Sequence, residues 1–193
     1  MLGTSKEIKY PGLNILPPGV ERHVVNGGGL TAFNIFPDDE IEIINNEGNQ
    51  ICEIICFNKD GKSDVGILNL KSNNNKNFIK DILSKKDESI LATNYQLKKL
   101  NLNISNSKSS IVFDIDSQIG EKIKLKSKDK CFAIFAAPGQ DMDVTKQNPP
   151  TDLIIYIKRA NIIDDKELNV IPNPVFEPSH EENINKASSI SYE

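Results

Sequence analysis

The sequence lacks the features that define several large classes of protein. Its 193 residues include no tryptophan, two histidines and three cysteines. Lysine and arginine total 23 against 27 aspartates and glutamates, so the net charge is −4 and no basic excess exists to neutralise nucleic-acid phosphates. No apolar run approaches the roughly 18 residues needed to span a membrane. We therefore expect neither a nucleic-acid partner nor a membrane partner.

The N-terminus and the cysteine count favour a cytoplasmic location. Residues 1–7 lack the apolar stretch of a signal peptide. Three cysteines without a secretory signal do not form a disulfide framework, and free thiols are typical of a reducing compartment. We therefore expect a cytoplasmic protein.

What the sequence does contain is a series of short segments with strand character. They are rich in β-branched and aromatic residues, and glycine, proline or asparagine turns separate many of them. These segments span 20–25, 30–36, 40–43, 50–57, 110–115, 122–126, 131–137 and 152–159, with a weaker alternation at 101–104. The last of the eight is apolar on both parities, which predicts burial on both faces. The spacing predicts a mainly β fold, an antiparallel barrel or sandwich-like domain.

Three further segments complete the predicted organisation. Residues 77–85 place four apolar side chains on one helical face, so the fold should contain one or two short helices. We assign 1–163 to the β-rich domain and 164–185, where prolines interrupt an acidic stretch, to a linker or extended C-terminal arm lying over the surface. Residues 186–193 alternate again, either as the start of a second unit or as a terminal strand of this one.

Few side chains have the chemistry of a catalytic or metal site. Cys52 and Cys56 lie four residues apart on one strand, a separation of about 13 Å that is too long for one zinc ion. Glu53 is a carboxylate within an apolar strand, so if buried it needs a partner such as Arg22 or a backbone donor. It is either part of a structural ion pair or a ligand contact. His23 lies beside the first strand, as a structural residue or as a contact to a ligand.

Several stretches together resemble the urea-carboxylase-associated domain family. Residues 45–57 (NNEGNQICEIICF) approach the family pattern Asp-x-x-Gly-x-Gln-x-x-Asp-x-x-x-Phe, in which Gly48 and Gln50 match. Phe57 also matches, whereas asparagine and glutamate replace the two aspartates. The stretches CFAIFAAPGQDM and QNPPTDLIIYIKR look like one branch of that family, the N-terminal region of aminomethyltransferase-like proteins related to the glycine-cleavage T-protein.

This resemblance implies a non-catalytic accessory domain. Such a domain would pack on a second β-unit or on a folate-dependent transferase domain of the same polypeptide, or would form a homo-oligomer. Tetrahydrofolate would bind in that transferase domain, and this chain would hold no cofactor, no metal and no catalytic residue. The histidine–aspartate pair of enzyme-like family members has no counterpart in this sequence. Gly48, Gln50 and Glu53 are carried over as the edge of a pocket.

Two other functions stay open. The first is a small-molecule enzyme acting on carbon–nitrogen bonds of urea-like or guanidine-like compounds, with Glu53, Gln50, Cys131 and His23 lining its pocket. The second is a ligand-binding or oligomerisation module without chemistry. Together with Gly48, these four residues form the predicted ligand-binding set.

Overall fold

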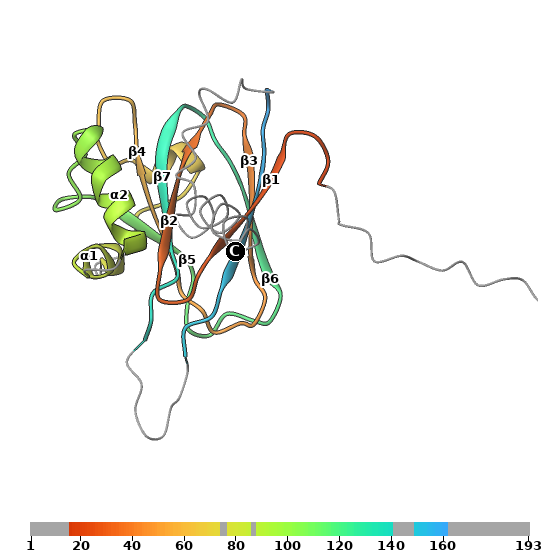
Figure 1. The fold of residues 1–193 in the computed structure, drawn as a ribbon. Coiled ribbons are helices and arrows are strands. Elements are labelled where there is room, and N and C mark those ends of the chain that lie inside the picture. The colour runs from red at the N-terminus through yellow and green to blue at the C-terminus, as the bar shows by residue number, and fades with distance from the viewer. Residues whose placement is uncertain (1–15, 74–76, 86–87, 141–148, 162–193) are drawn as a thin grey trace, which may run out of the picture.

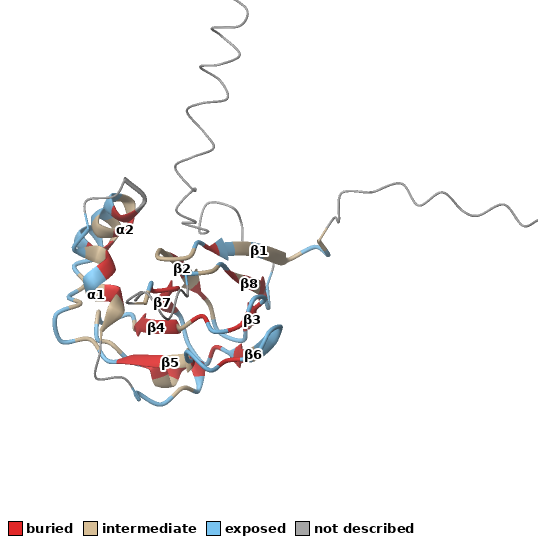
Figure 2. Ribbon diagram, turned by 90° about the horizontal axis from the view of Figure 1, so that it is seen from below, coloured by how far each residue is buried: buried red, intermediate tan, exposed pale blue. Residues whose placement is uncertain are grey.

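The fold consists of two packed antiparallel sheets. The computed structural model describes residues 16–73, 77–85, 88–140 and 149–161. Each sheet has four strands (Figure 1), and their orders, β1-β8-β3-β6 and β2-β7-β4-β5, are seen in Figure 2. The strands are β1 (Val20–Val25), β2 (Leu30–Ile35), β3 (Glu40–Asn45), β4 (Cys52–Phe57), β5 (Ser109–Phe113), β6 (Glu121–Lys126), β7 (Cys131–Ala136) and β8 (Leu153–Lys158). The prediction of a mainly β fold is confirmed, in its sandwich-like form rather than as a closed barrel.

The sheet β2-β7-β4-β5 is the middle layer of the molecule. One of its faces packs on the other sheet, and the opposite face packs on α1 (Phe78–Leu83) and α2 (Glu88–Lys99), as Figures 1 and 2 show. Every residue of β4 and of β7 is buried in consequence. In β4, Cys52, Ile54 and Cys56 enter the core between the sheets, while Ile55 and Phe57 enter the core beneath the helices. Because successive side chains of a strand point to opposite faces, β4 contributes to both cores.

The sheet β1-β8-β3-β6 has one face that no described helix covers. In β8, the side chains of Leu153, Ile155 and Ile157 are buried against the other sheet. Ile154 and Tyr156 point to the open face and are only half-buried. The prediction that β8 is buried on both faces is therefore wrong for the described part of the chain.

The prediction of one or two short helices is confirmed. The expected helix at 77–85 is confirmed as α1, capped by the Asn77 side chain, which accepts from the Lys80 N–H. Helix α2 follows it, and a short 3-10 helix (Val65–Leu68) follows β4. Residues 101–104 form no strand, and 164–185 and 186–193 lie outside the described residues.

A membrane-crossing helix is not found in the described part of the chain, where no helix is both long and apolar enough.

Candidate functional site

The turns at one end of the sandwich are tied together by hydrogen bonds, and we call this the loop end. It comprises the β1–β2, β3–β4 and β5–β6 turns with residues 137–140 and 149–152. Gly28 N–H donates to Ala137 O at 2.7 Å, and Gly27 N–H donates to an Asp152 carboxylate oxygen at 2.9 Å. A Cβ added at Gly27 would lie 2.3 Å from Pro150 O, so only glycine permits this approach. The glycine run is therefore explained by packing.

Asn45 holds the β3–β4 turn in place. Its side chain is fully buried, and its amide nitrogen donates to Gln50 O at 3.0 Å and to the Ser117 hydroxyl at 2.7 Å. Its amide oxygen accepts from the Gly48 N–H at 3.0 Å. Gly48 has φ +73°, and a Cβ there would meet Ile119 N at 2.9 Å. An amide is suited to this position because it donates and accepts at once, which a carboxylate does not.

Gln50 links the β3–β4 turn to the segment that follows β7 and to the segment that precedes β8. Its amide nitrogen donates to Ile51 O at 2.9 Å and to Pro138 O at 3.0 Å, and its amide oxygen accepts from Thr151 N–H at 2.7 Å. Both amide hydrogens are thus used by backbone carbonyls. The structure brings Gly48 and Gln50 together at the loop end, and their contact with a ligand stays a prediction.

Glu53 points away from the loop end, toward the helices. It is fully buried, and its carboxylate accepts from the Ile79 N–H at 2.7 Å in the first turn of α1. Backbone N–H groups at a helix N-terminus are unpaired within the helix and attract negative charge. Of the two partners considered, the backbone donor is the one found, whereas Arg22 is exposed on β1 opposite Tyr156. A contact of Glu53 with a ligand stays a prediction.

Cys131 lies in the core between the sheets, at the opposite end of β7 from the loop end. Cys52, Cys56 and Cys131 are all free and buried. A hydrogen bond with Cys131, together with burial, raises the pKa of the Cys56 thiol, and burial raises that of Cys52. Protonated buried thiols are unreactive. Ligand binding by Cys131 stays a prediction, and its environment is that of a small apolar side chain.

The other end of the sandwich is held by charge, and we call it the arginine end. Arg159 follows β8, and its side chain is 4% exposed. Its guanidinium donates to Asp39 at 2.7 Å and to Asn34 O at 2.9 Å. Asp39 is fully buried and also accepts from the Phe36 and Ala160 N–H groups. The buried carboxylate is thus satisfied by one cation and two backbone donors.

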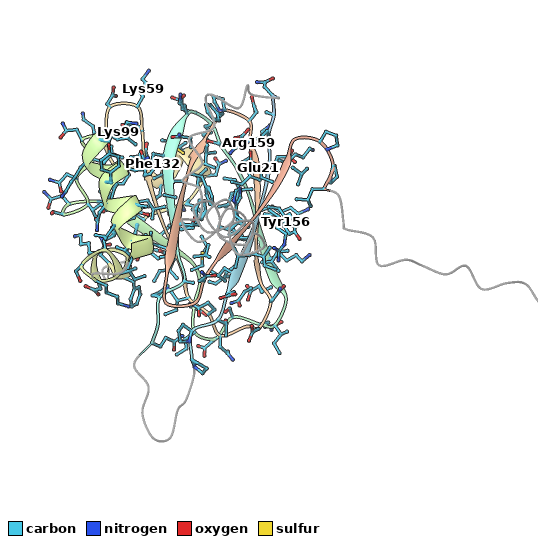
Figure 3. The ribbon with its side chains drawn as sticks, in the orientation of Figure 1. Glu21, Lys59, Lys99, Phe132, Tyr156 and Arg159 are labelled. Carbon is cyan, nitrogen blue, oxygen red and sulfur yellow. The ribbon has the colours of Figure 1, made fainter. Side chains whose placement is uncertain are left out.

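Glu21 connects this ion pair to His23. Two guanidinium nitrogens of Arg159 donate to the two carboxylate oxygens of Glu21, at 2.7 and 2.9 Å. One of these oxygens lies 3.0 Å from Nε2 of His23. Burial raises the pKa of the Glu21 carboxyl, but the hydrogen bonds from His23 and Arg159 outweigh it and set the pKa at about 2. Glu21 and Arg159 are labelled side by side in Figure 3.

The His23 ring is fixed on two sides yet keeps contact with solvent. It packs on Phe33 with ring centroids 4.3 Å apart, and its side chain is 19% exposed. A histidine oriented by a carboxylate is a standard arrangement for proton transfer near neutral pH. Of the five predicted ligand-binding residues, His23 has the chemistry of a proton carrier. We take His23, Glu21 and Arg159, with Asp39 behind them, as the candidate site.

The sequence analysis identified His23 but missed its three partners. Glu21 and Arg159 are 138 residues apart, and Arg159 and Asp39 are 120 apart. Such pairs depend on the β1–β8 and β3–β8 registers, which local patterns do not specify. The available signal was Arg159 itself, a cation that ends a long apolar strand. Within the described residues, no group of three or more His, Cys, Asp or Glu side chains is placed to hold a metal ion.

Comparisons with known proteins give one relative of high significance. The chain is 29% identical to the trimethylamine-oxide aldolase of Ruegeria pomeroyi over 185 residues, which is 96% of this chain and 23% of that protein. The chain thus spans about a quarter of the length of that curated relative. No family model matches the chain. A DUF1989 family protein of Silicibacter pomeroyi has a solved structure that covers 74% of this chain and 80% of its own, with 9% identity and a TM-score of 0.42.

These findings overturn the predicted relationship to urea-carboxylase-associated and aminomethyltransferase-like proteins. The relative matched over nearly the whole chain is named as an aldolase. The non-catalytic accessory role in an aminomethyltransferase is therefore wrong as well. The stretches that carried the resemblance contain β7 and β8, whose apolar residues fill the core. Apolar sequences of this kind reflect burial in a core, and proteins of unrelated activity have similar buried strands.

Proposed function

We propose that this chain is part of an enzyme that cleaves a carbon–nitrogen bond of a small methylated amine oxide. The similarity to a trimethylamine-oxide aldolase over 96% of the chain carries this proposal. It agrees with the open alternative of a small-molecule enzyme acting on carbon–nitrogen bonds. Because the chain spans 23% of that relative, we assign the activity to the complete natural polypeptide and a supporting site to this chain.

The proposed reaction converts trimethylamine oxide, C3H9NO, into formaldehyde, CH2O, and dimethylamine, C2H7N. One carbon–nitrogen bond and the nitrogen–oxygen bond break, and a carbon–oxygen double bond forms. The methyl carbon loses two electrons and the nitrogen gains two, so no external oxidant is needed. One proton leaves the methyl carbon and one reaches the nitrogen. The reaction therefore needs groups that accept and return a proton.

His23 is the described residue best suited to that proton. Its ring is oriented by the Glu21 carboxylate, which Arg159 in turn holds with two hydrogen bonds. Because the pKa of Glu21 is about 2, its carboxylate stays ionised near neutral pH and accepts a hydrogen bond from the His23 ring. Glu21 is a positioning residue in this proposal, since it acts through His23.

The test is product formation from trimethylamine oxide by the complete natural polypeptide and by the 193-residue chain. We expect formaldehyde and dimethylamine in equal amounts from the complete polypeptide, followed by proton NMR. His23→Gln should lower kcat at least tenfold, and Glu21→Gln should move the pH profile. Exposed Arg22→Gln on the same strand is the matched control. Turnover of urea or guanidine instead would replace the substrate class, and binding without turnover would favour a ligand-binding module.

The remaining predictions are tested in the same setting. A cytoplasmic location is supported by three free cysteines, all buried. The absence of a cofactor in this chain, and a need for tetrahydrofolate elsewhere in the polypeptide, stay predictions that addition of tetrahydrofolate to the assay addresses. Homo-oligomer formation is measured by light scattering, and packing on other parts of the polypeptide by the binding of this chain to those parts prepared separately. The absence of nucleic-acid and membrane partners is likewise only predicted.

A further inference from the structure

An open groove lies against the face of the β1-β8-β3-β6 sheet that no described helix covers. Its volume is about 900 Å³. Apolar side chains from distant parts of the sequence line it: Leu16 and Val20 lead into or begin β1, and Leu68 and Leu70 follow β4. Tyr156 of β8 also lines it and is labelled in Figure 3 on the side of the molecule away from the helices. The groove is large enough for a stretch of polypeptide.

The strand beneath this groove has an unusual composition for an open face. Strands with one face toward water normally alternate apolar and polar residues. β8 carries Ile154 and Tyr156 on its open side, and β1 adds Val24 next to Ile154, with 38% of Val24 exposed. Covering these side chains would remove apolar surface from water.

The same face is basic although the whole chain is acidic. The outward positions of its strands hold five basic residues against two acidic ones, whereas the net charge of the chain is −4. The basic residues are Arg22, Lys122, Lys124, Lys126 and Lys158, and the acidic residues are Glu40 and Glu42. A ligand of this face should therefore combine apolar side chains with negative charge.

Residues 162–193 have that combination. This segment contains seven acidic and two basic residues, together with apolar stretches such as Ile162–Ile163 and Val175–Phe176. It begins four residues after Lys158, which lines the groove. Thirty-two residues extend up to about 100 Å, far more than a groove of this size requires. At most eight residues of the chain lie outside the match to the aldolase, so most of this segment belongs to the shared sequence.

We propose that residues 162–193 bind in this groove, with their apolar side chains on Tyr156 and their carboxylates near the lysines of β6 and β8. The groove supplies an apolar floor and a rim with three lysines, which form exposed ion pairs with Glu40, Glu42 and Asp38 that an incoming carboxylate would share. The proposal gives the predicted surface arm at 164–185 a definite binding site. It does not depend on the proposed activity, because it rests on the open face and on the charge of the segment.

Hydrogen–deuterium exchange of the 193-residue chain tests this proposal. The exchange of residues 162–193 is compared with that of a free peptide of the same sequence. Binding in the groove should slow exchange in the chain at least tenfold, since opening then precedes exchange. The protection should weaken at 1 M salt, where charges are screened over about 3 Å.

Two double variants show where the segment binds. Lys124→Glu with Lys158→Glu reverses two charges on the groove and should bring exchange to the free-peptide rate. Lys59→Glu with Lys99→Glu makes the same change on the opposite side of the molecule, as Figure 3 shows, and should leave the protection unchanged. Unchanged exchange in β4 verifies that each variant is folded, and Tyr156→Ser tests the apolar floor separately.

Three results would overturn the proposal. Exchange of 162–193 at the free-peptide rate in the unmodified chain would show that the segment does not bind. Protection that survives Lys124→Glu with Lys158→Glu and also survives Tyr156→Ser would place the segment elsewhere. Protection that falls on dilution would assign the groove to the segment of a second copy.

Discussion

The two ends of the sandwich provide hydrogen-bond partners for their backbone groups with different chemistry. At the loop end, the neutral amides of Asn45 and Gln50 satisfy backbone groups of the β3–β4 turn, of Pro138 and of Thr151. At the arginine end, a buried cation and two carboxylates do so, and the network reaches the partly exposed His23. Neutral amides do not titrate, whereas the ionic network changes with pH. The loop end is therefore suited to structure, and the arginine end to structure combined with proton transfer.

The largest expected effect comes from removing the cation of the arginine end. Arg159→Met leaves Asp39 buried without its counter-charge, which typically costs about 3–5 kcal/mol. The free energy of unfolding is measured in urea. Lys158→Met is the matched control, because the neighbouring Lys158 is exposed and its described ion pair is a surface one, with Glu40 at 3.3 Å. A loss below about 1 kcal/mol for Arg159→Met would contradict the assigned role of the ion pair.

The loop end should respond less strongly, and without dependence on pH. Gln50→Ala removes three hydrogen bonds and leaves the Pro138 carbonyl buried without this donor, an expected loss of about 2–3 kcal/mol. Gln140→Ala is the control at the same end, where one amide hydrogen bond to Asn49 O is exposed. Urea unfolding at pH 7 and pH 4 should give the same difference for Gln50→Ala. A difference that grows with pH would mean that this network is coupled to a charge.

The pH dependence of stability separates the two ends directly. The pKa of Glu21 is about 2 in the folded protein and ordinarily 4.5, so its contribution is present above pH 4.5 and lost as the pH falls toward 2. One pKa unit corresponds to 1.36 kcal/mol, and partial exposure reduces the total to about 2 kcal/mol. Urea unfolding between pH 6 and pH 2.5 should therefore show a steeper loss than that of Glu21→Gln. If the free energy of unfolding fell equally with pH in both proteins, Glu21 would not contribute to the stability of this network.

The smallest expected effect comes from alanine substitutions at two glycines of the loop end, which separate backbone strain from crowding of the added Cβ. Gly48 and Gly120 have nearly the same φ, +73° and +74°. A Cβ at Gly48 would meet Ile119 N at 2.9 Å, whereas nothing lies within 4 Å of a Cβ at Gly120. Gly120→Ala should lower the free energy of unfolding by about 1 kcal/mol, because alanine disfavours a positive φ. Gly48→Ala should lower it by about 1 kcal/mol more, because its Cβ also meets the backbone of Ile119. Equal thermal shifts for the two variants would mean that the β5–β6 turn moves freely.

The strands were predictable because each one carries its own pattern. All eight were identified within about two residues at each end, and the two parities of β4 match its two cores. Helix α2 was missed because its apolar residues do not form one stripe. Leu91 and Tyr95 are 56% and 66% exposed, while Ile90 and Leu97 are buried. Exposed apolar residues dilute the periodicity on which such a prediction depends.

The candidate site was less predictable than the fold. His23 was identified from its residue type, but the side chains that give it a role come from β1, the β2–β3 turn and the end of β8. Their contact follows from strand order, and no local pattern contains strand order. The match of residues 45–57 to a family pattern was misleading for a related reason. Asn45 and Gln50 bind backbone groups, so the same residues suit any protein that needs this turn.

The strand order has a consequence for how the chain is made. β1 pairs with β8, and residues that are hydrogen-bonded neighbours, such as Val20 and Lys158, are separated by nearly the whole described chain. During synthesis, β1 leaves the ribosome long before its only described partner in the sheet exists. Folds dominated by such distant pairings form slowly, and unpaired strands are prone to aggregate. Between its own synthesis and that of β8, β1 therefore has no described partner strand and is exposed to aggregation.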